Sequence, residues 1–311
     1  FTKISLIENN VDEFFFNQEL LVENHVMAKR ATDFLNLFRP KKNTRFCIET
    51  QMNLPASSGL ASSACGFAAL VSALNDLFKW QLTKQELSIL ARLGSGSACR
   101  SLWEGFVEWH SGSRNDGMDS YAEPIDLVWN SLCMGLLIID FEKKKISSRD
   151  AMRQTVQSSC YYSAWPHKVA RDMKSLKQAM LEKDFDTFGK TCESNALAMH
   201  ASMLTAWPPI LYWTEKSLQA IQKIWQLRQE GLSIYFTQDA GPNLKLLFQY
   251  NDLSQIKTIF PDLEIVWPFI PPDGNNQVVL VNEKDHATGM AEKMMAHQKA
   301  LCHRAFSVFI F

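Results

Sequence analysis

The sequence predicts an α+β protein of two domains, with the division near Lys145. In the first half, alternating strand-like segments are separated by runs with helical apolar spacing. Beyond Lys143–Lys145 the chain becomes largely helical, with a few short strand-like segments between the helices. At 311 residues the chain is long enough for two domains of ordinary size. We therefore expect domains at residues 1–145 and 146–311.

The first half contains two helices and three strands in this interpretation. The apolar residues of Cys65–Phe78 recur at helical spacing. Thr83, with Glu86 three residues later, has the pattern of a capping box and predicts a helix that ends near Gly94. Alternation and apolar runs predict strands at residues 44–53, 105–109 and 131–140. Lys143–Lys145 reads as a hairpin tip or the domain junction.

The second half is predicted to be mostly helical. The expected helices are Arg149–Tyr162, Val169–Leu181, Phe185–Ala201, Pro209–Glu230 and Leu244–Tyr250. Strands are expected at Ser233–Gln238, Leu263–Trp267 and Gln277–Val281. His200 falls within the third of these helices, where we expect it to be a packing residue.

The composition limits the classes of partner. The formal net charge of −1 gives no general attraction for nucleic acid or for an acidic membrane. The seven cysteines are scattered and contain no C-x-x-C pair, which argues against a disulfide framework or a zinc site. The longest apolar run, Cys133–Ile139, is far shorter than a membrane span. These features predict a cytoplasmic protein without nucleic-acid or membrane partners.

The loop Pro55–Ala64 has the composition of a phosphate-binding loop. Small residues let the backbone approach a ligand, and Gly59 permits a positive φ. The helix predicted after it offers free N–H groups and a positive dipole end, while Ser62 and Ser63 add hydroxyl donors. No G-K-[ST] follows, so this is not a Walker sequence. The alternative is an ordinary capped turn before a core helix.

Three further segments carry groups that can bind or react. Gly94–Arg100 combines small residues and hydroxyls with an Arg that can grip a carboxylate or phosphate through two bonds, unless it is only a flexible surface loop. Ser147-Ser148-Arg149 begins a predicted helix and reads either as an N-cap or as an anion site. Asp239, at the end of a predicted strand, reads either as a turn former or as a general base.

Taken together and in this order, these segments resemble the diphosphomevalonate decarboxylases, a branch of the GHMP kinase superfamily. The resemblance runs from about Asn53 to Tyr250. It is carried by Asn53–Leu70, Ala91–Ser101, Ser147–Arg149 ahead of Met152, Met199-His200-Ala201, Ala206–Ile210 and Asp239–Asn243. The string G-S-G-S-A-C-R-S resembles the decarboxylases specifically, whereas P-x-x-x-G-L-x-S-S-A is shared with the wider kinase group.

The resemblance implies a fold, a reaction and a set of site residues. The fold would be GHMP-kinase-like, with an N-terminal ribosomal-protein-S5-like domain and a C-terminal ferredoxin-like α/β sandwich. The enzyme would use ATP and Mg²⁺ to convert (R)-5-diphosphomevalonate into isopentenyl diphosphate, CO₂, ADP and phosphate, and it would be a homodimer. The implied catalytic residues are Asp239 as the base and Arg100. The implied substrate-binding residues are Ser95, Gly96, Ser97, Arg100, Ser148 and Arg149. The implied ATP phosphate-binding residues are Ser58, Gly59, Leu60, Ala61, Ser62 and Ser63. No metal ligand is assigned.

Two other functions stay open at this stage. A kinase that phosphorylates mevalonate or phosphomevalonate without decarboxylation would use the same phosphate loop. An inactive family member kept as a binding protein is the other possibility. Its support is that the family's Lys-bearing pocket segment has no match before Thr44, so that segment either lies upstream of Phe1 or differs in this protein.

Overall fold

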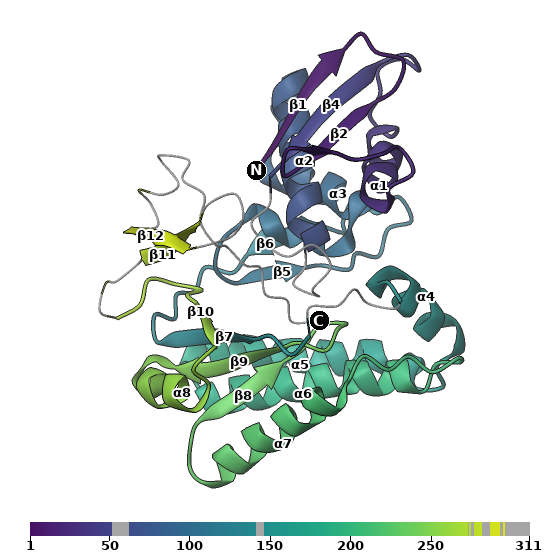
Figure 1. The fold of residues 1–311 in the computed structure, drawn as a ribbon. Helices are drawn as coiled ribbons and strands as arrows, with labels where there is room; N and C mark the ends of the chain where they lie inside the picture. The colour runs from purple at the N-terminus through teal and green to yellow at the C-terminus, as the bar shows by residue number, and fades with distance from the viewer. Residues whose placement is uncertain are drawn as a thin grey trace. The chain divides into compact units, whose positions relative to one another are not determined.

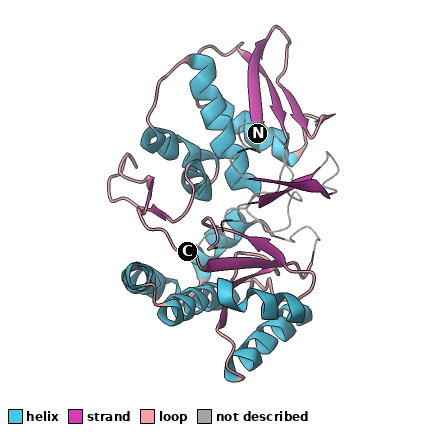
Figure 2. Ribbon diagram, turned by 90° about the vertical axis from the view of Figure 1, so that its left-hand side faces the viewer, coloured by secondary structure: helices cyan, strands magenta, loops and turns pink. Residues whose placement is uncertain are grey.

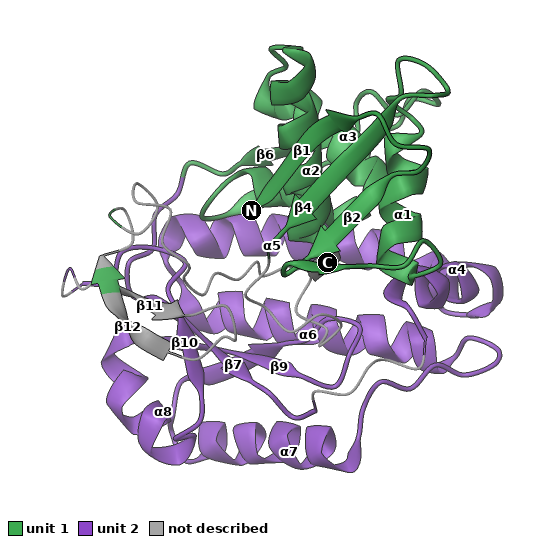
Figure 3. Cartoon of the chain, turned by 45° about the horizontal axis from the view of Figure 1, so that its top comes forward, with its two compact units in different colours: residues 1–55, 61–126, 278–307 green, residues 56–60, 127–277, 308–311 purple. Residues whose placement is uncertain are grey.

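The computed structural model describes residues 1–51, 62–140, 146–272, 274, 277–281, 287–292 and 295. The described chain forms two compact units, one mainly from residues 1–126 and the other mainly from residues 127–277 (Figure 3). It passes from the first unit to the second at Asp126–Leu127, ahead of the boundary expected after residue 145. Lys143–Lys145, expected at the junction, lies outside the described residues.

Unit 1 contains a four-stranded sheet in the order β1-β4-β2-β3 (Figure 1). Its central strand is β4 (Arg45–Thr50), as the alternating segment at residues 44–53 predicted. β4 is antiparallel to β1 (Thr2–Ile7) and parallel to β2 (Glu13–Phe16), which pairs in turn with β3 (Glu19–Leu20). Nothing in the sequence analysis anticipated β1, β2 and β3, nor the helix α1 (Val26–Leu35).

The helices of unit 1 pack on this sheet through the apolar residues that recur at helical spacing in the sequence. α2 (Ser62–Phe78) and α3 (Lys84–Gly94) confirm the two predicted helices, and the capping box between Thr83 and Glu86 is present. Their apolar stripes share one core with α1 and β4 that includes Phe34, Phe46 and Leu74. A small antiparallel sheet of β5 (Val107–Trp109) and β6 (Ala122–Pro124) follows in the same unit.

Unit 2 is built on a second four-stranded sheet, in the order β10-β7-β9-β8. Its strands are β7 (Leu132–Leu137), β8 (Ile234–Thr237), β9 (Leu244–Gln249) and β10 (Glu264–Val266), all antiparallel to their neighbours. The helix predicted at Leu244–Tyr250 is therefore wrong. That segment is a short apolar run without diagnostic periodicity, and pairing with β7 and β8 on both sides makes it a central strand.

Helices cover both faces of this sheet (Figure 2). On one face Ile234, Phe236 and Leu246 share a core with α7 (Glu215–Gln229) and α8 (Leu253–Ile259). On the other face Tyr235 lies directly against Gly189 of α6. The remaining helices are α4 (Ser148–Ser158), α5 (Trp165–Glu182) and α6 (Phe185–Leu204), close to their predicted ranges. Among the described residues no helix is long and apolar enough to cross a membrane.

The start of α7 differs from its prediction at Pro209. The helix begins at Glu215, where Thr214 and Ser217 cap each other reciprocally through two 3.2 Å bonds from backbone N–H groups. Upstream, Ile210 and Tyr212 are buried in a cluster with Met199 and other apolar residues of α6 and α4. Burial of alternate residues keeps this segment non-helical until the cap.

Three short 3₁₀ helices and two strands complete the described elements. The 3₁₀ helices are η1 (Gly96–Leu102), η2 (Tyr162–Ala164) and η3 (Tyr250–Asp252). The strands β11 (Gln277–Val281) and β12 (Ala287–Glu292) pair with each other.

Candidate active site

Asp239 lies in a turn that side-chain hydrogen bonds fix from within. The turn follows β8 and leads into β9, and Asp239 itself is buried. Gln238 donates from Nε2 to the carbonyl oxygen of Gly241 at 2.9 Å, and its Oε1 accepts a 2.7 Å bond from the indole of Trp213. Because buried polar groups that find partners resist rearrangement, the backbone on either side of Asp239 is held in one conformation.

The far end of the same turn is tied to two other elements of unit 2. The Asn243 carboxamide accepts from the backbone N–H groups of Ile139 and Asp140 at 2.7 and 3.0 Å, and it donates to the Asp140 carbonyl at 3.0 Å. Ser217, in the first turn of α7, donates to the Pro242 carbonyl at 3.0 Å. These hydrogen bonds hold the turn Asp239–Asn243 in one conformation and so fix the backbone that carries the Asp239 carboxylate.

The two carboxylate oxygens of Asp239 have different surroundings. Oδ2 accepts a hydrogen bond from Nζ of Lys245, and the two side chains form a buried ion pair. Oδ1 is buried as well, yet within the described residues it has no hydrogen-bond partner. A buried acceptor without a partner is costly, so such groups are commonly found where a ligand or reactant supplies the missing bond. This arrangement suits a carboxylate that accepts a proton.

Sequence reasoning missed Lys245. Its signal was a charged residue at the second position of an otherwise apolar run, Leu244–Phe248, which was interpreted as a helix. In the actual strand Lys245 is flanked by Thr237 on β8 and Leu136 on β7, both buried.

His200 supports the backbone of Asp239. Its Nε2 lies 3.1 Å from the Asp239 carbonyl oxygen, and since a carbonyl only accepts, Nε2 carries the proton. The imidazole stacks on Trp213 at a centroid distance of 5.1 Å and meets Tyr212 edge-on. Burial lowers the pKa of His200 from 6.5 to about 4. His200 is thus the buried packing residue that the sequence suggested, neutral near pH 7.

Arg100 lies in the 3₁₀ helix η1, which argues against the alternative of a flexible surface loop at Gly94–Arg100. Ser95 ends α3, and a 2.8 Å bond from the N–H of Ala98 to the Ser95 carbonyl begins the 3₁₀ turn. Ala98 and Cys99 are fully buried in that turn, so the segment is packed against the rest of unit 1. The Arg100 guanidinium lies over the ring of Trp109, 5.6 Å from its centroid.

The four predicted substrate-binding residues of unit 1 lie at the end of α3 and in the η1 helix that follows it. Ser95 and Ser97 approach each other with their hydroxyl oxygens 3.4 Å apart, and both are half-buried. Gly96 lies against Trp109 so closely that an added Cβ would be 2.8 Å from the ring. Arg100 follows one 3₁₀ turn later. Two hydroxyls and a guanidinium on and beside one short helix are groups that can bind an anion.

In unit 2, Ser148 and Arg149 begin α4. Ser147 is the N-cap, accepting a 3.1 Å bond from the N–H of Asp150, so the capping interpretation holds for that residue. α4 is linked to the Asp239 turn, because Ala151 and Ala240 belong to one buried apolar cluster. The first turn of α4 and the turn that contains Asp239 are therefore packed against the same apolar cluster.

The phosphate-binding residues are the least described part of the site. Ser58, Gly59, Leu60 and Ala61 lie outside the described residues, and the side chains of Ser62 and Ser63 are likewise not described. α2 begins at Ser62, so the helix N-terminus lies within the last residues of the predicted loop Pro55–Ala64.

No protein cage for magnesium is assigned. Among the described residues there is no group of three or more His, Cys, Asp or Glu side chains placed to hold a metal ion. Magnesium is usually held by substrate phosphates, water and one or two oxygen ligands, so it does not require such a group.

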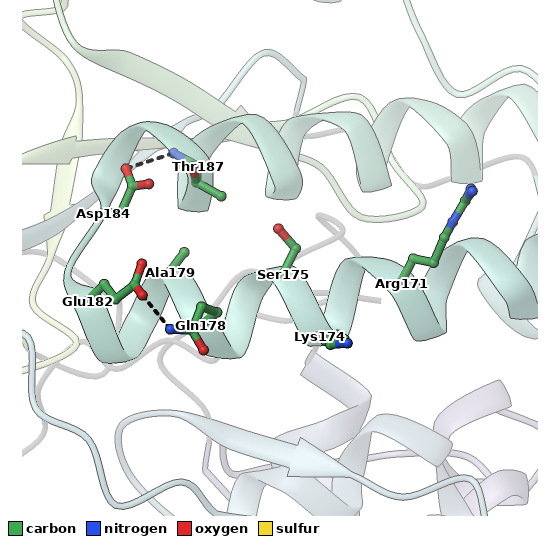
Figure 4. A pocket seen from close by; sticks show the side chains of 8 residues that line it. All are labelled: Arg171, Lys174, Ser175, Gln178, Ala179, Glu182, Asp184 and Thr187. Carbon is green, nitrogen blue, oxygen red and sulfur yellow. Dashed lines mark hydrogen bonds between the residues drawn. The ribbon is translucent and has the colours of Figure 1, made fainter.

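A surface hollow of about 410 Å³ lies along α5 and the start of α6, and no predicted site residue is among those that line it (Figure 4). Its carboxylates are already engaged: Gln178 donates to Glu182, and Asp184 accepts a 3.1 Å bond from the N–H of Thr187. The hollow carries no part of the candidate site.

The chain is similar to known proteins in both sequence and structure. Residues 2–122 match the family described as diphosphomevalonate decarboxylase-like N-terminal domain, and residues 134–309 match the mevalonate 5-diphosphate decarboxylase C-terminal domain. The similarity therefore extends well beyond the range Asn53–Tyr250 on which the sequence resemblance was based.

Two curated relatives illustrate the level of identity. The diphosphomevalonate decarboxylase of Aspergillus fumigatus is 38% identical over 210 residues, which are 66% of this chain and 52% of the relative. The Candida albicans enzyme is 38% identical over 218 residues, 68% of this chain and 59% of the relative. The chain thus spans between half and six-tenths of the length of these relatives.

Solved structures give the same match in three dimensions. The mevalonate diphosphate decarboxylase from Enterococcus faecalis, studied for its ATP binding, aligns with a TM-score of 0.78 at 37% identity, covering 86% of this chain and 83% of the other. A structure of MDDEF in complex with MVAPP, AMPPCP and magnesium aligns with a TM-score of 0.79 at 37% identity, covering 86% and 84%.

Proposed function

This chain belongs to the diphosphomevalonate decarboxylase family, and its fold is GHMP-kinase-like; we propose that it decarboxylates (R)-5-diphosphomevalonate at the expense of ATP. The products are isopentenyl diphosphate, CO₂, ADP and phosphate. The observation that carries the proposal is the buried Oδ1 of Asp239, which lacks a hydrogen-bond partner among the described residues while Oδ2 is held by Lys245.

The chemistry begins at the C3 hydroxyl of the substrate. This alcohol is tertiary and hindered, so it must be positioned, and its proton must be accepted as the oxygen attacks the γ-phosphorus of ATP. Asp239 Oδ1 takes that proton. Phosphorylation makes the C3 oxygen a good leaving group. Its departure as phosphate leaves C3 electron-deficient, and the electrons of the bond to the carboxylate carbon then form the new double bond as CO₂ leaves.

The remaining predicted residues hold the charged ends of the two substrates. Arg100 grips the carboxylate that becomes CO₂ through two parallel bonds, with its guanidinium supported by Trp109. Ser95, Gly96, Ser97, Ser148 and Arg149 hold the diphosphate side of the substrate. The residues Ser58–Ser63 and the N-terminus of α2 hold the ATP phosphates. Bound magnesium would neutralise charge on the phosphate groups during transfer.

The neighbouring complex with MVAPP, AMPPCP and magnesium supports ATP and Mg²⁺ as requirements for this protein. We also propose that the protein acts in the cytoplasm as a homodimer, on a small-molecule substrate and without nucleic-acid or membrane partners.

One assay tests the proposal against both alternatives. The protein is supplied with ATP, Mg²⁺ and 5-diphosphomevalonate labelled at C1, and labelled CO₂ and ADP are both measured. Equal amounts of the two support the decarboxylase. With unlabelled mevalonate or phosphomevalonate as acceptor, ADP without CO₂ indicates a kinase. No turnover of any acceptor overturns both enzymes. A nucleotide-dependent rise in Tm would then support a binding protein.

A further inference from the structure

We propose that Lys245 is the positioning residue of the base. Its ammonium group holds Oδ2 of Asp239, so that Oδ1 alone faces the substrate hydroxyl. The inference rests on the proposed function, because it assigns to Asp239 the proton-accepting role described above. It adds a residue that no motif of the sequence contains.

The buried location of Lys245 in a sheet strand points to a functional role. It lies in the central strand β9 between Leu244 and Leu246, and its side chain is 3% exposed. Removing an ammonium group from water costs several kcal/mol, which attraction to one partner offsets only when the geometry is favourable. An apolar residue at this strand position would pack without that cost. Stability alone therefore does not explain a lysine here.

The strand register directs Lys245 toward the Asp239 turn. Lys245 pairs with Thr237, the last residue of β8, and side chains of directly paired residues project from the same face of a sheet. Asp239 follows Thr237 by two residues. The ion pair thus links β9 to the turn that contains Asp239. The backbone of that turn is already held by hydrogen bonds from Gln238 and His200.

Backbone bonds alone do not orient the carboxylate. A carboxyl group can rotate about its last torsion, which is broad and has no strong minima. The bond from Lys245 removes that freedom, because one oxygen is fixed and the other must then lie on the opposite side. In the reaction the proton passes from the C3 oxygen to Oδ1, and Lys245 keeps all of its protons throughout.

The experiment compares variants of the whole chain in the CO₂ assay. K245M removes the charge and the donor, K245Q keeps a donor without the charge, and K245R keeps both. K216M is the matched control, since Lys216 is exposed on α7 of the same unit. D239N and the double variant D239N/K245M complete a cycle. For each variant kcat, the KM for both substrates and Tm are measured.

We expect K245M to lower kcat roughly 10- to 100-fold while both KM values change less than about 3-fold, as misplacement of a reacting group does. K245R should keep most of the activity, and K245Q should lie between the two. Because Lys245 acts through Asp239, adding K245M to D239N should change the residual rate by less than about 2-fold. K216M should match the wild type.

The outcomes separate the inference from the proposed function. If the wild type releases no CO₂, the proposed function fails and Lys245 has no base to position. If the wild type is active and folded K245M keeps its kcat, or K245R is as impaired as K245M, only the inference is overturned. If K245M and K245Q do not fold whereas D239N/K245M is as stable as the wild type, Lys245 serves stability and the inference is again overturned.

Discussion

The imidazole of His200 stacks on the indole of Trp213, and its Nε2–H donates to the carbonyl oxygen of Asp239 across 3.1 Å. Trp213 donates in turn to Gln238, the residue before Asp239. His200 thus contacts the backbone of Asp239, whereas Trp213 contacts the side chain of the residue before it. The carboxylate is held separately, by Lys245. Backbone and side chain of the proposed base are therefore positioned by independent groups.

Stability should depend on pH through His200. Burial lowers its folded-state pKa from 6.5 to about 4, so between these values the unfolded chain binds a proton that the folded protein does not. The contribution of neutral His200 to the free energy of unfolding is therefore fully present above pH 6.5 and is lost as the pH falls toward 4. A shift of this size corresponds to about 3 kcal/mol. Urea unfolding of the wild type and of His200→Asn at pH 7 and pH 4.5 measures the difference between the two pH dependences.

The variant supplies the control for this measurement, because every other titrating group is present in both proteins. We expect His200→Asn to be less stable than the wild type at pH 7 but to lose less stability on acidification. Equal losses in the two proteins would contradict the assignment of His200 as a buried neutral residue.

Asp239→Asn should abolish most turnover without abolishing nucleotide binding. The amide cannot accept the hydroxyl proton, and loss of a general base typically costs about 10²- to 10⁴-fold in rate. The ATP phosphates are assigned to other residues, so the nucleotide-dependent rise in Tm should survive. Asp262→Asn, an exposed carboxylate of the same unit, is the matched control. Normal CO₂ release by Asp239→Asn would remove Asp239 from its role.

Replacement of Arg100 should affect the two substrates unequally. Arg100→Lys keeps the charge but loses the paired donors, and Arg100→Ala loses both. Losing hydrogen bonds to a charged group costs roughly 1.5–3 kcal/mol, so we expect kcat/KM for 5-diphosphomevalonate to fall about 10- to 100-fold in Arg100→Ala. The KM for ATP should change little, as it should in the exposed control Arg153→Ala. Steady-state kinetics with each substrate varied in turn gives both values. A larger effect on ATP than on 5-diphosphomevalonate would reassign Arg100 to the nucleotide.

The sequence predicted those helices whose signals lie within a few neighbouring residues, such as α2 and α3. The capping box of Thr83 and Glu86 placed the start of α3, and apolar spacing placed α2, because both signals lie within a few residues of each other. Asp239 was predicted at the end of a strand because the strand pattern and the Gly-Pro turn after it are adjacent in the sequence. The family resemblance then supplied roles that none of these residues reveals alone.

The features that were missed depend on pairing between distant segments. β9 was predicted to be a helix, since the periodicity of a short run does not reveal that β7 and β8 flank it. β1 pairs with β4 although the paired residues are 38 (Ile7 with Arg45) to 48 (Thr2 with Thr50) positions apart in the chain. Lys245 is close to Asp239 in sequence, yet the ion pair follows from a strand register that was not predicted. Local propensity does not contain these contacts.

Gly96→Ala tests whether Trp109 supports Arg100. A Cβ at position 96 would lie 2.8 Å from the Trp109 ring, so the indole must shift. That shift strains the 3.1 Å bond from the indole N–H to Ser120 Oγ and moves the surface beneath the guanidinium. Overpacking of this kind costs typically 1–3 kcal/mol. We expect a lower Tm together with a raised KM for 5-diphosphomevalonate and an unchanged KM for ATP.

Trp109→Leu distinguishes the support from simple crowding. Leucine leaves room beside Gly96→Ala but offers no aromatic face to Arg100, so a cation–π contribution of about 0.5–2 kcal/mol is lost. Trp109→Leu should therefore raise the KM for 5-diphosphomevalonate by itself, and adding Gly96→Ala should raise it little further, because both changes act on one contact. Fully additive effects in this double-mutant cycle, or a Trp109→Leu enzyme with wild-type KM, would show that Arg100 is positioned without the indole.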